Sequence, residues 1–176
     1  MLTLLLGGAR SGKSALAVEM GRRHAGSVTF VATAPVLDHD LAGRIDRHRA
    51  ERPAWPTVEE PYDLAGALDG IAVDDLVVVD CLTLWVSNLM ARGDEDAAIL
   101  ADGEATAEAA ARRVGPTVVV SNEVGLGVHP ETPLGLRYRD VLGLVNQAWA
   151  ARAATTLFLV AGRAIVLDEP WKHVSS

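Results

Sequence analysis

Short runs of apolar residues alternate along the chain with longer stretches in which apolar positions recur at helical spacing. The runs are hydrophobic at consecutive positions and rich in β-branched residues, which is typical of strands buried on both faces of a parallel sheet. Five such strands are predicted, at Leu2–Leu6, Ser27–Ala32, Leu76–Val79, Thr117–Val120 and Thr155–Val160. Helices are predicted at residues 12–24, 38–51, 62–69, 81–92, 96–113 and 133–153. This alternation predicts a three-layer α/β fold with a mostly parallel central sheet.

The pattern gives no sign of a second domain, so we expect a single nucleotide-binding catalytic domain over residues 1–176. The segment most typical of a loop is Glu51–Pro61, where three prolines end the preceding helix and keep the chain extended.

Composition narrows the classes of partner. The formal net charge is -7 and basic residues form no long block, which argues against a nucleic-acid-binding surface. No stretch approaches the roughly 20 apolar residues of a membrane helix, so we expect no membrane insertion. The single cysteine, Cys81, indicates a reducing cytoplasm, and its apolar neighbours predict a buried structural thiol.

The first predicted strand runs directly into a phosphate-binding motif. Residues 7–14 read Gly-Gly-Ala-Arg-Ser-Gly-Lys-Ser, matching G-x-x-x-x-G-K-[ST] between a strand and a helix. Glycines allow successive backbone N–H groups to face phosphate oxygens, and the helix start adds its positive end. The motif predicts nucleoside triphosphate binding by Gly7, Gly8, Ala9, Arg10, Ser11, Gly12, Lys13 and Ser14. Within it, Lys13 would reach the outer phosphates and the Ser14 hydroxyl would ligate Mg²⁺.

A second candidate metal ligand is Asp80, which ends the apolar strand Leu76–Val79. In P-loop proteins, a carboxylate at such a strand tip holds Mg²⁺ directly or through water. Aspartate also favours turns, so the alternative is an ordinary strand end. Because the chain also contains a P-loop, we predict that Asp80 binds the metal ion. The histidines show no metal-ligand spacing, and no zinc site is predicted.

Arginine and histidine concentrate in one predicted helix. Arg44, His48 and Arg52 fall at i, i+4 and i+8 and would share a face, with Arg49 beside them. This face could bind an anion, and His48 could attack phosphorus while the arginines stabilise departing pyrophosphate. A solvated helix with internal ion pairs is the alternative.

Two further segments have two interpretations each. Glu59 could accept hydrogen bonds from a bound nucleotide, or simply be solvated like most loop glutamates. The stretch from Ser121 to Glu131, with its two glycines, could be shaped for ligand approach, with Asn122 and Glu123 facing the cleft. It could equally be a plain strand-to-helix connection.

Taken together, these segments resemble one family, the bifunctional adenosylcobinamide kinase/adenosylcobinamide-phosphate guanylyltransferases of cobalamin biosynthesis. The P-loop form and Asn122-Glu123-Val124-Gly125 are the narrowest of the matching features. The others are Ala32-Thr33-Ala34, Arg44-Ile45-Asp46-Arg47-His48-Arg49, Arg52-Pro53, Thr57-Val58-Glu59, Val79-Asp80-Cys81-Leu82-Thr83, Tyr138-Arg139-Asp140 and Val145-Asn146-Gln147.

The resemblance implies a RecA-like P-loop fold and two reactions. ATP or GTP would phosphorylate adenosylcobinamide, and GTP would then transfer GMP to that phosphate through a guanylylated histidine, which corresponds to His48. Arg49 and Arg52 would neutralise pyrophosphate, and Glu59 with Ala32, Thr33 and Ala34 would recognise nucleotide. A member of the family is a trimer, which implies a homo-oligomer.

Two other functions stay open from sequence. A monofunctional P-loop small-molecule kinase would share the motif but need no histidine nucleophile. A regulatory GTPase or nucleotide-gated binding module is disfavoured because the sequence contains no Asn-Lys-x-Asp guanine-reading element.

Overall fold

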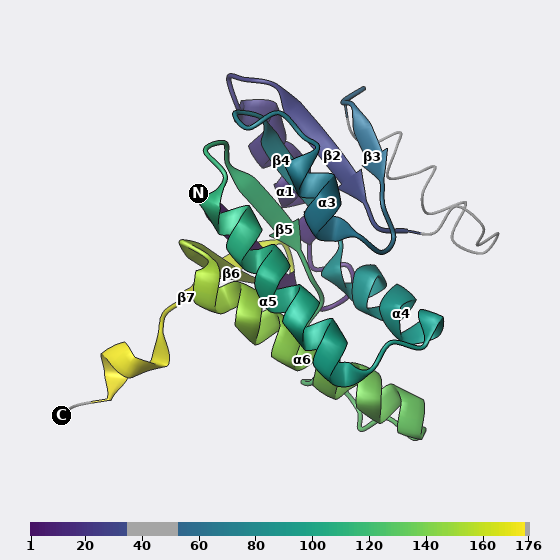
Figure 1. Ribbon diagram of the computed structural model, residues 1–176. Helices are drawn as coiled ribbons and strands as arrows, with labels where there is room; N and C mark the ends of the chain where they lie inside the picture. Colours follow the sequence, from purple (N-terminus) through teal and green to yellow (C-terminus); the bar gives the residue numbers. More distant parts are fainter. Residues whose placement is uncertain (35–52, 175–176) are drawn as a thin grey trace.

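The computed structural model describes residues 1–34 and 53–174 (Figure 1). The strands are β1 (Leu2–Gly7), β2 (Val28–Ala32), β3 (Thr57–Glu59), β4 (Leu76–Asp80), β5 (Thr117–Val120), β6 (Thr155–Val160) and β7 (Arg163–Leu167). The helices are α1 (Lys13–Arg23), α3 (Leu64–Asp69), α4 (Leu82–Arg92), α5 (Asp96–Arg112), α6 (Pro133–Arg152) and the 3₁₀ turn η1 (Pro170–His173). The helix predicted at 38–51 lies outside the described residues.

The strands form one sheet in the order β3-β2-β4-β5-β1-β6-β7. All pairings among β1 to β6 are parallel, and β7 pairs antiparallel with β6. The predicted α/β fold with a mostly parallel sheet is therefore confirmed. Because the strands are parallel, the segments that follow β1, β2, β4 and β5 all emerge at one edge of the sheet, where ligands of such folds bind.

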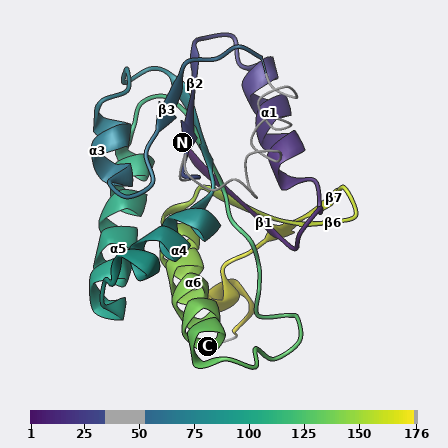
Figure 2. The ribbon, with the colours of Figure 1, turned by 90° about the vertical axis from the view of Figure 1, so that its right-hand side faces the viewer.

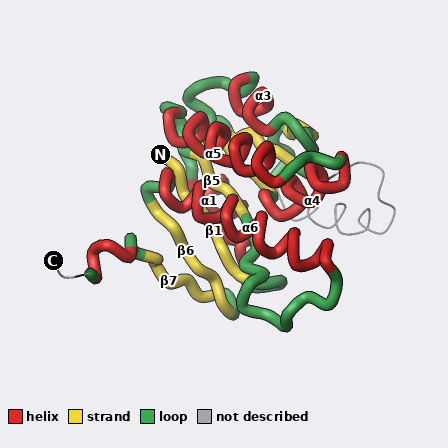
Figure 3. Tube along the Cα trace, turned by 60° about the horizontal axis from the view of Figure 1, so that its bottom comes forward, coloured by secondary structure: helices red, strands yellow, loops and turns green. Residues whose placement is uncertain are grey.

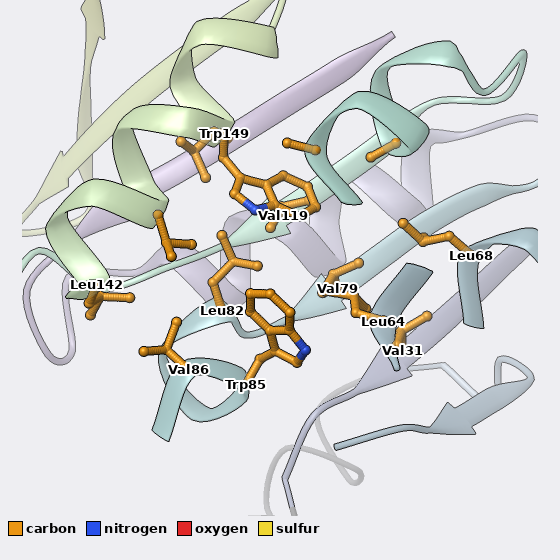
Figure 4. Packing of buried hydrophobic residues seen from close by; sticks show 14 of the residues in the cluster. Val31, Leu64, Leu68, Val79, Leu82, Trp85, Val86, Val119, Leu142 and Trp149 are labelled. Carbon is orange, nitrogen blue, oxygen red and sulfur yellow. The ribbon is translucent and has the colours of Figure 1, made fainter. Parts of the chain in front are cut away.

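Helices cover both faces of the sheet unequally. Alternate residues of β1 separate the two sides: Leu4 packs in the larger core, beneath α3, α4, α5 and α6, and Leu5 packs in the smaller one, beneath α1. Figure 2 shows α1 on the face of the sheet opposite to α3 and α5. In the larger core, Trp85 and Trp149 lie fully buried between helices and sheet (Figure 4). None of the helices in the described ranges combines the length and apolarity that a membrane span requires.

Two strands were missed at the sequence level. β3 lies within the proline-rich segment interpreted as a loop; it is an edge strand, where proline is tolerated, and the Pro56 carbonyl accepts from the Phe30 amide (2.9 Å). β7 follows a tight turn at Ala161 and Gly162, whose φ values are both positive (50° and 71°). Such turns suit the twist of a hairpin. After β7 the chain leaves the body of the molecule, as the tube in Figure 3 shows.

Candidate active site

The P-loop joins β1 to α1 at the carboxyl edge of the sheet. Gly7 and Gly12 have φ of 152° and 102°, so the backbone follows a path that a side chain would strain. A Cβ on Gly7 would lie 2.4 Å from the Leu159 carbonyl oxygen on β6. Helix α1 begins at Lys13 with no side-chain cap and no acidic residue in its first turn. Its first amides are therefore oriented for an anion.

The Lys13 side chain is folded back along the loop. Its ammonium donates to the carbonyls of Gly7 (2.8 Å) and Gly8 (2.7 Å) and approaches the Ser11 hydroxyl (3.4 Å). The side chain is buried, and this burial lowers its pKa, while the nearby Cys81 and Asp80 act in the opposite direction. The ammonium therefore lies against the backbone of the predicted phosphate-binding loop.

The sheet brings the predicted residues of two other strands to the same edge. Ala32 ends β2 and is in register with Asp80 at the end of β4, so these two segments are neighbours. The Thr33 hydroxyl accepts from the Cys81 amide (2.8 Å) and donates to the Cys81 carbonyl (2.7 Å), and the Thr33 amide donates to the Asp80 carbonyl (3.2 Å). Thr33 is completely buried, so it acts through the backbone of the segment that holds Asp80.

Asn88 on α4 is a supporting residue that the sequence analysis missed. Its side-chain amide donates to the carbonyls of Thr33 (2.7 Å) and Pro61 (3.1 Å). The pairs are 55 and 27 residues apart in sequence. Since Asn88 is buried, these bonds fix the segments after β2 and β3 to each other. In the sequence, the only indication of this role is that Asn88 is a polar residue on the apolar face of a predicted helix.

The loop after β5 is tied directly to the P-loop. The amide of Glu123 donates to the Gly7 carbonyl (3.1 Å), where the phosphate-binding loop begins. Ser121 is buried and donates to Asn146 on α6 (2.6 Å), whose amide donates to the Asn122 carbonyl (3.0 Å). Asn122 and Glu123 are both partly exposed at the site edge. The segment is thus more than a plain connection, because it helps to hold the P-loop.

A second support reaches the P-loop from the turn between β6 and β7. The Gly162 amide donates to the Ser11 carbonyl (2.9 Å), and a Cβ on Gly12 would lie 3.4 Å from the Gly162 Cα. Sequence analysis did not anticipate this contact, because it joins two backbones and leaves no side-chain signature.

Two partly buried side chains near the site, Cys81 and Tyr138, have raised pKa values. Burial raises the pKa of the Cys81 thiol to about 12, and the Asp80 carboxylate adds to the shift. The thiol is therefore protonated at neutral pH, in line with a structural role. Burial also raises the pKa of Tyr138, whose hydroxyl donates to the Thr83 carbonyl (3.1 Å).

The remaining predicted site residues divide into two groups. Glu59 is exposed at the end of β3, in register with Ala32, and the neighbouring Glu60 amide donates to the Ala32 carbonyl (2.9 Å). Hence the structure brings the segments of the P-loop, Ala32–Ala34, Glu59 and Asp80 to one sheet edge. His48, Arg49 and Arg52 lie outside the described residues.

Comparison with known proteins gives a consistent result. The family model for "Cobinamide kinase / cobinamide phosphate guanyltransferase" matches residues 3–167. The bifunctional adenosylcobalamin biosynthesis protein CobP of Pseudomonas aeruginosa is 43% identical over 164 residues, covering 92% of this chain and 94% of that protein. The CobU protein of the same description from Escherichia coli K12 is 37% identical over 176 residues, covering 92% and 97%.

A solved structure supports the fold. An ATPase from the type III secretion system of pathogenic bacteria superimposes with a TM-score of 0.58 at 10% identity. The match covers 99% of this chain and 58% of that protein. The sequence match, which extends over nearly the whole chain, identifies it as a member of the cobinamide kinase / cobinamide phosphate guanyltransferase family.

Proposed function

We propose that this chain phosphorylates adenosylcobinamide with ATP or GTP and then transfers GMP from GTP to the phosphate, giving adenosylcobinamide-GDP. The observation that supports this most strongly is the P-loop with Lys13 inside it and Asp80 nearby, in a chain of this family. The shared P-loop fold alone would be compatible with many nucleotide-using activities.

In the first reaction, a hydroxyl oxygen of the corrinoid attacks the γ-phosphorus. The bond from that phosphorus to the β–γ bridging oxygen breaks, and the hydroxyl proton leaves to solvent. Lys13 exchanges the carbonyls of Gly7 and Gly8 for phosphate oxygens, so a donor already in place stabilises the charge of the transition state. The loop amides and the start of α1 add further stabilisation.

Mg²⁺ fits the residues present. Ser14 lies in the first turn of α1 and Asp80 at the tip of β4, which gives a hydroxyl and a carboxylate, both hard oxygen donors. Across residues 1–34 and 53–174, no group of three or more His, Cys, Asp or Glu side chains is placed to hold a metal ion. A site of few protein ligands suits Mg²⁺, which shares substrate phosphates and keeps several waters. Ser14 and Asp80 would hold the ion, which would neutralise phosphate charge.

In the second reaction, an imidazole nitrogen of His48 attacks the α-phosphorus of GTP. A P–N bond forms, and the bond to pyrophosphate breaks. A phosphate oxygen of the corrinoid phosphate then displaces the imidazole and takes the GMP group. Arg49 and Arg52 neutralise pyrophosphate. These three roles rest on the sequence, since the residues lie outside the described ranges.

Nucleotide recognition is assigned to the paired ends of β2 and β3. Ala32, Thr33 and Ala34 provide a backbone path beside the site, and Glu59 supplies an exposed carboxylate in register with Ala32. A carboxylate can accept hydrogen bonds from ribose hydroxyls or a base edge.

The decisive experiment labels the protein with GTP carrying radioactive α-phosphate in the presence of Mg²⁺. Wild type, His48→Ala and His24→Ala are compared after denaturation, with acid and alkali treatment of each. Acid-labile, alkali-stable label in wild type and His24→Ala, and none in His48→Ala, is expected for a guanylyl-histidine. A folded wild type that binds GTP but takes up no label would reduce the proposal to the kinase step.

We also propose that the chain acts in the cytoplasm, where ATP and GTP are available.

We further propose that the chain forms a homo-oligomer through β7. Every residue of β7 is exposed, with Ile165 at 61% and Val166 at 65%. Because neighbouring strand residues point to opposite sides, both faces of this edge strand are uncovered. Light scattering after size-exclusion chromatography should give a multiple of the 18.6 kDa chain mass, reduced by Ile165→Lys. A wild-type monomer would contradict the oligomer.

A further inference from the structure

We propose that the exposed apolar side chains of Leu126 and Val128, in the loop that joins β5 to α6, bind the macrocycle of the corrinoid acceptor. The inference rests on the proposed function, because the acceptor defines the ligand. Beyond that function, it names the surface on which the corrinoid lies. This loop projects from the carboxyl edge of the sheet in Figure 2.

Both side chains are unusually open to solvent. Leu126 is 80% exposed and Val128 is 93% exposed, and each follows a glycine, Gly125 or Gly127, which has no side chain to cover it. Two exposed apolar residues, two positions apart on a loop near a reaction site, favour contact with an apolar ligand surface.

The ends of the loop are held in place. At the first end, the Glu123 amide donates to the Gly7 carbonyl, and the Glu123 carboxylate accepts from the Gly125 amide. At the second end, Arg139 contacts His129 Nδ1 (3.1 Å), and the Thr132 hydroxyl caps α6 by accepting from the Gly135 amide (3.1 Å). Leu126 and Val128 are therefore presented by a braced loop rather than by a fraying end.

Position selects the corrinoid among possible ligands. The loop begins near Glu123, whose amide donates a hydrogen bond to the Gly7 carbonyl. It therefore borders the proposed site of phosphate transfer. The reacting hydroxyl sits at the end of a flexible arm, and the macrocycle is far too large to enter between strand ends. The ring must therefore lie on a surface within reach of the P-loop. Its methyl groups suit leucine and valine, and its amide side chains suit the polar Asn122 and His129 at the base of the loop.

Two exposed valines lie far from this loop and can serve as controls. Val73 and Val114 precede β4 and β5, at the opposite edge of the sheet, where the Gly115 amide donates to the Val73 carbonyl (2.8 Å). Val114 is 71% exposed, which makes it a matched control for the loss of an exposed valine.

The test measures corrinoid binding without turnover. Equilibrium dialysis with adenosylcobinamide, followed by its visible absorption, gives Kd for wild type, the double variant Leu126→Ser/Val128→Ser, and Val114→Ser. Loss of two apolar contacts should raise Kd for the corrinoid about tenfold or more in the double variant. GTP affinity, guanylyl labelling and oligomer mass should be unchanged, and Val114→Ser should behave as wild type.

Three results would overturn the inference: an unchanged corrinoid Kd, an equal loss of GTP binding, or a change of oligomer mass that makes the loop a subunit interface. Failure of the proposed function would look different. In that case, the wild type would transfer neither phosphate nor GMP to the corrinoid, whatever the dialysis shows.

Discussion

Asn88 offers a direct test of how the site is built. Replacing it by alanine removes the donors to the Thr33 and Pro61 carbonyls, which lie 2.7 and 3.1 Å away. Each lost bond, with its carbonyl left unsatisfied, costs about 1–2 kcal/mol, so Asn88→Ala should lower the free energy of unfolding by about 2–4 kcal/mol. With a urea m-value of about 2 kcal/mol/M, the midpoint should fall by about 1–2 M.

The same substitution should also weaken nucleotide use, because Thr33 holds the backbone at Cys81 beside Asp80. We expect a higher KM for GTP in the folded variant. Ser87→Ala, on the exposed side of the same helix, is the matched control and should change stability by no more than about 0.5 kcal/mol. A loss below about 1 kcal/mol in Asn88→Ala would refute the reasoning, since removing one buried and one partly buried hydrogen bond should cost more than that.

Three other predictions concern the framework. Gly7→Ala should abolish nucleotide binding, since a Cβ would lie 2.4 Å from a carbonyl oxygen of β6; Gly143→Ala on α6, with nothing within 4 Å, should retain it in a fluorescent-nucleotide titration. Arg113 donates to four carbonyls, so Arg113→Met should cost about 3 kcal/mol in urea unfolding. Arg112→Met, which removes a surface ion pair, should cost about 0.5 kcal/mol or less; equal losses would contradict this. The pKa of Cys81 is raised from 9.0 to about 12, so above pH 9 only the unfolded thiol ionises and stability falls as pH rises. Wild type should lose up to about 1.4 kcal/mol per pH unit more than Cys81→Ala between pH 9 and 12; parallel curves would contradict the assignment.

The parts of the fold that sequence predicted are those set by local pattern. β1, β2, β4 and β5 are mainly apolar runs because both of their faces are covered, and β6, which is only partly covered, has a similar run. Their sequence is enough to locate these five strands. β3 lacks that signal because it is a short edge strand with exposed and partly exposed residues. β7 differs: four of its five residues, Ala164 to Leu167, form an apolar run, yet every residue of the strand is exposed. Its pairing with β6 depends on the two-residue turn at Ala161 and Gly162, which sequence analysis did not interpret as a hairpin.

The candidate site shows the same division more sharply. The P-loop motif predicts phosphate binding, yet the shape of the loop depends on contacts from distant parts of the chain. The Glu123 amide bonds to the Gly7 carbonyl, and the Gly162 amide bonds to the Ser11 carbonyl. Both donors are backbone groups, so almost any residue at position 123 could supply the first of them. The motif residues can be recognised in the sequence because phosphate binding requires particular residue types at those positions. The segments that hold them contribute through backbone position, which only the sheet order β5-β1-β6 determines.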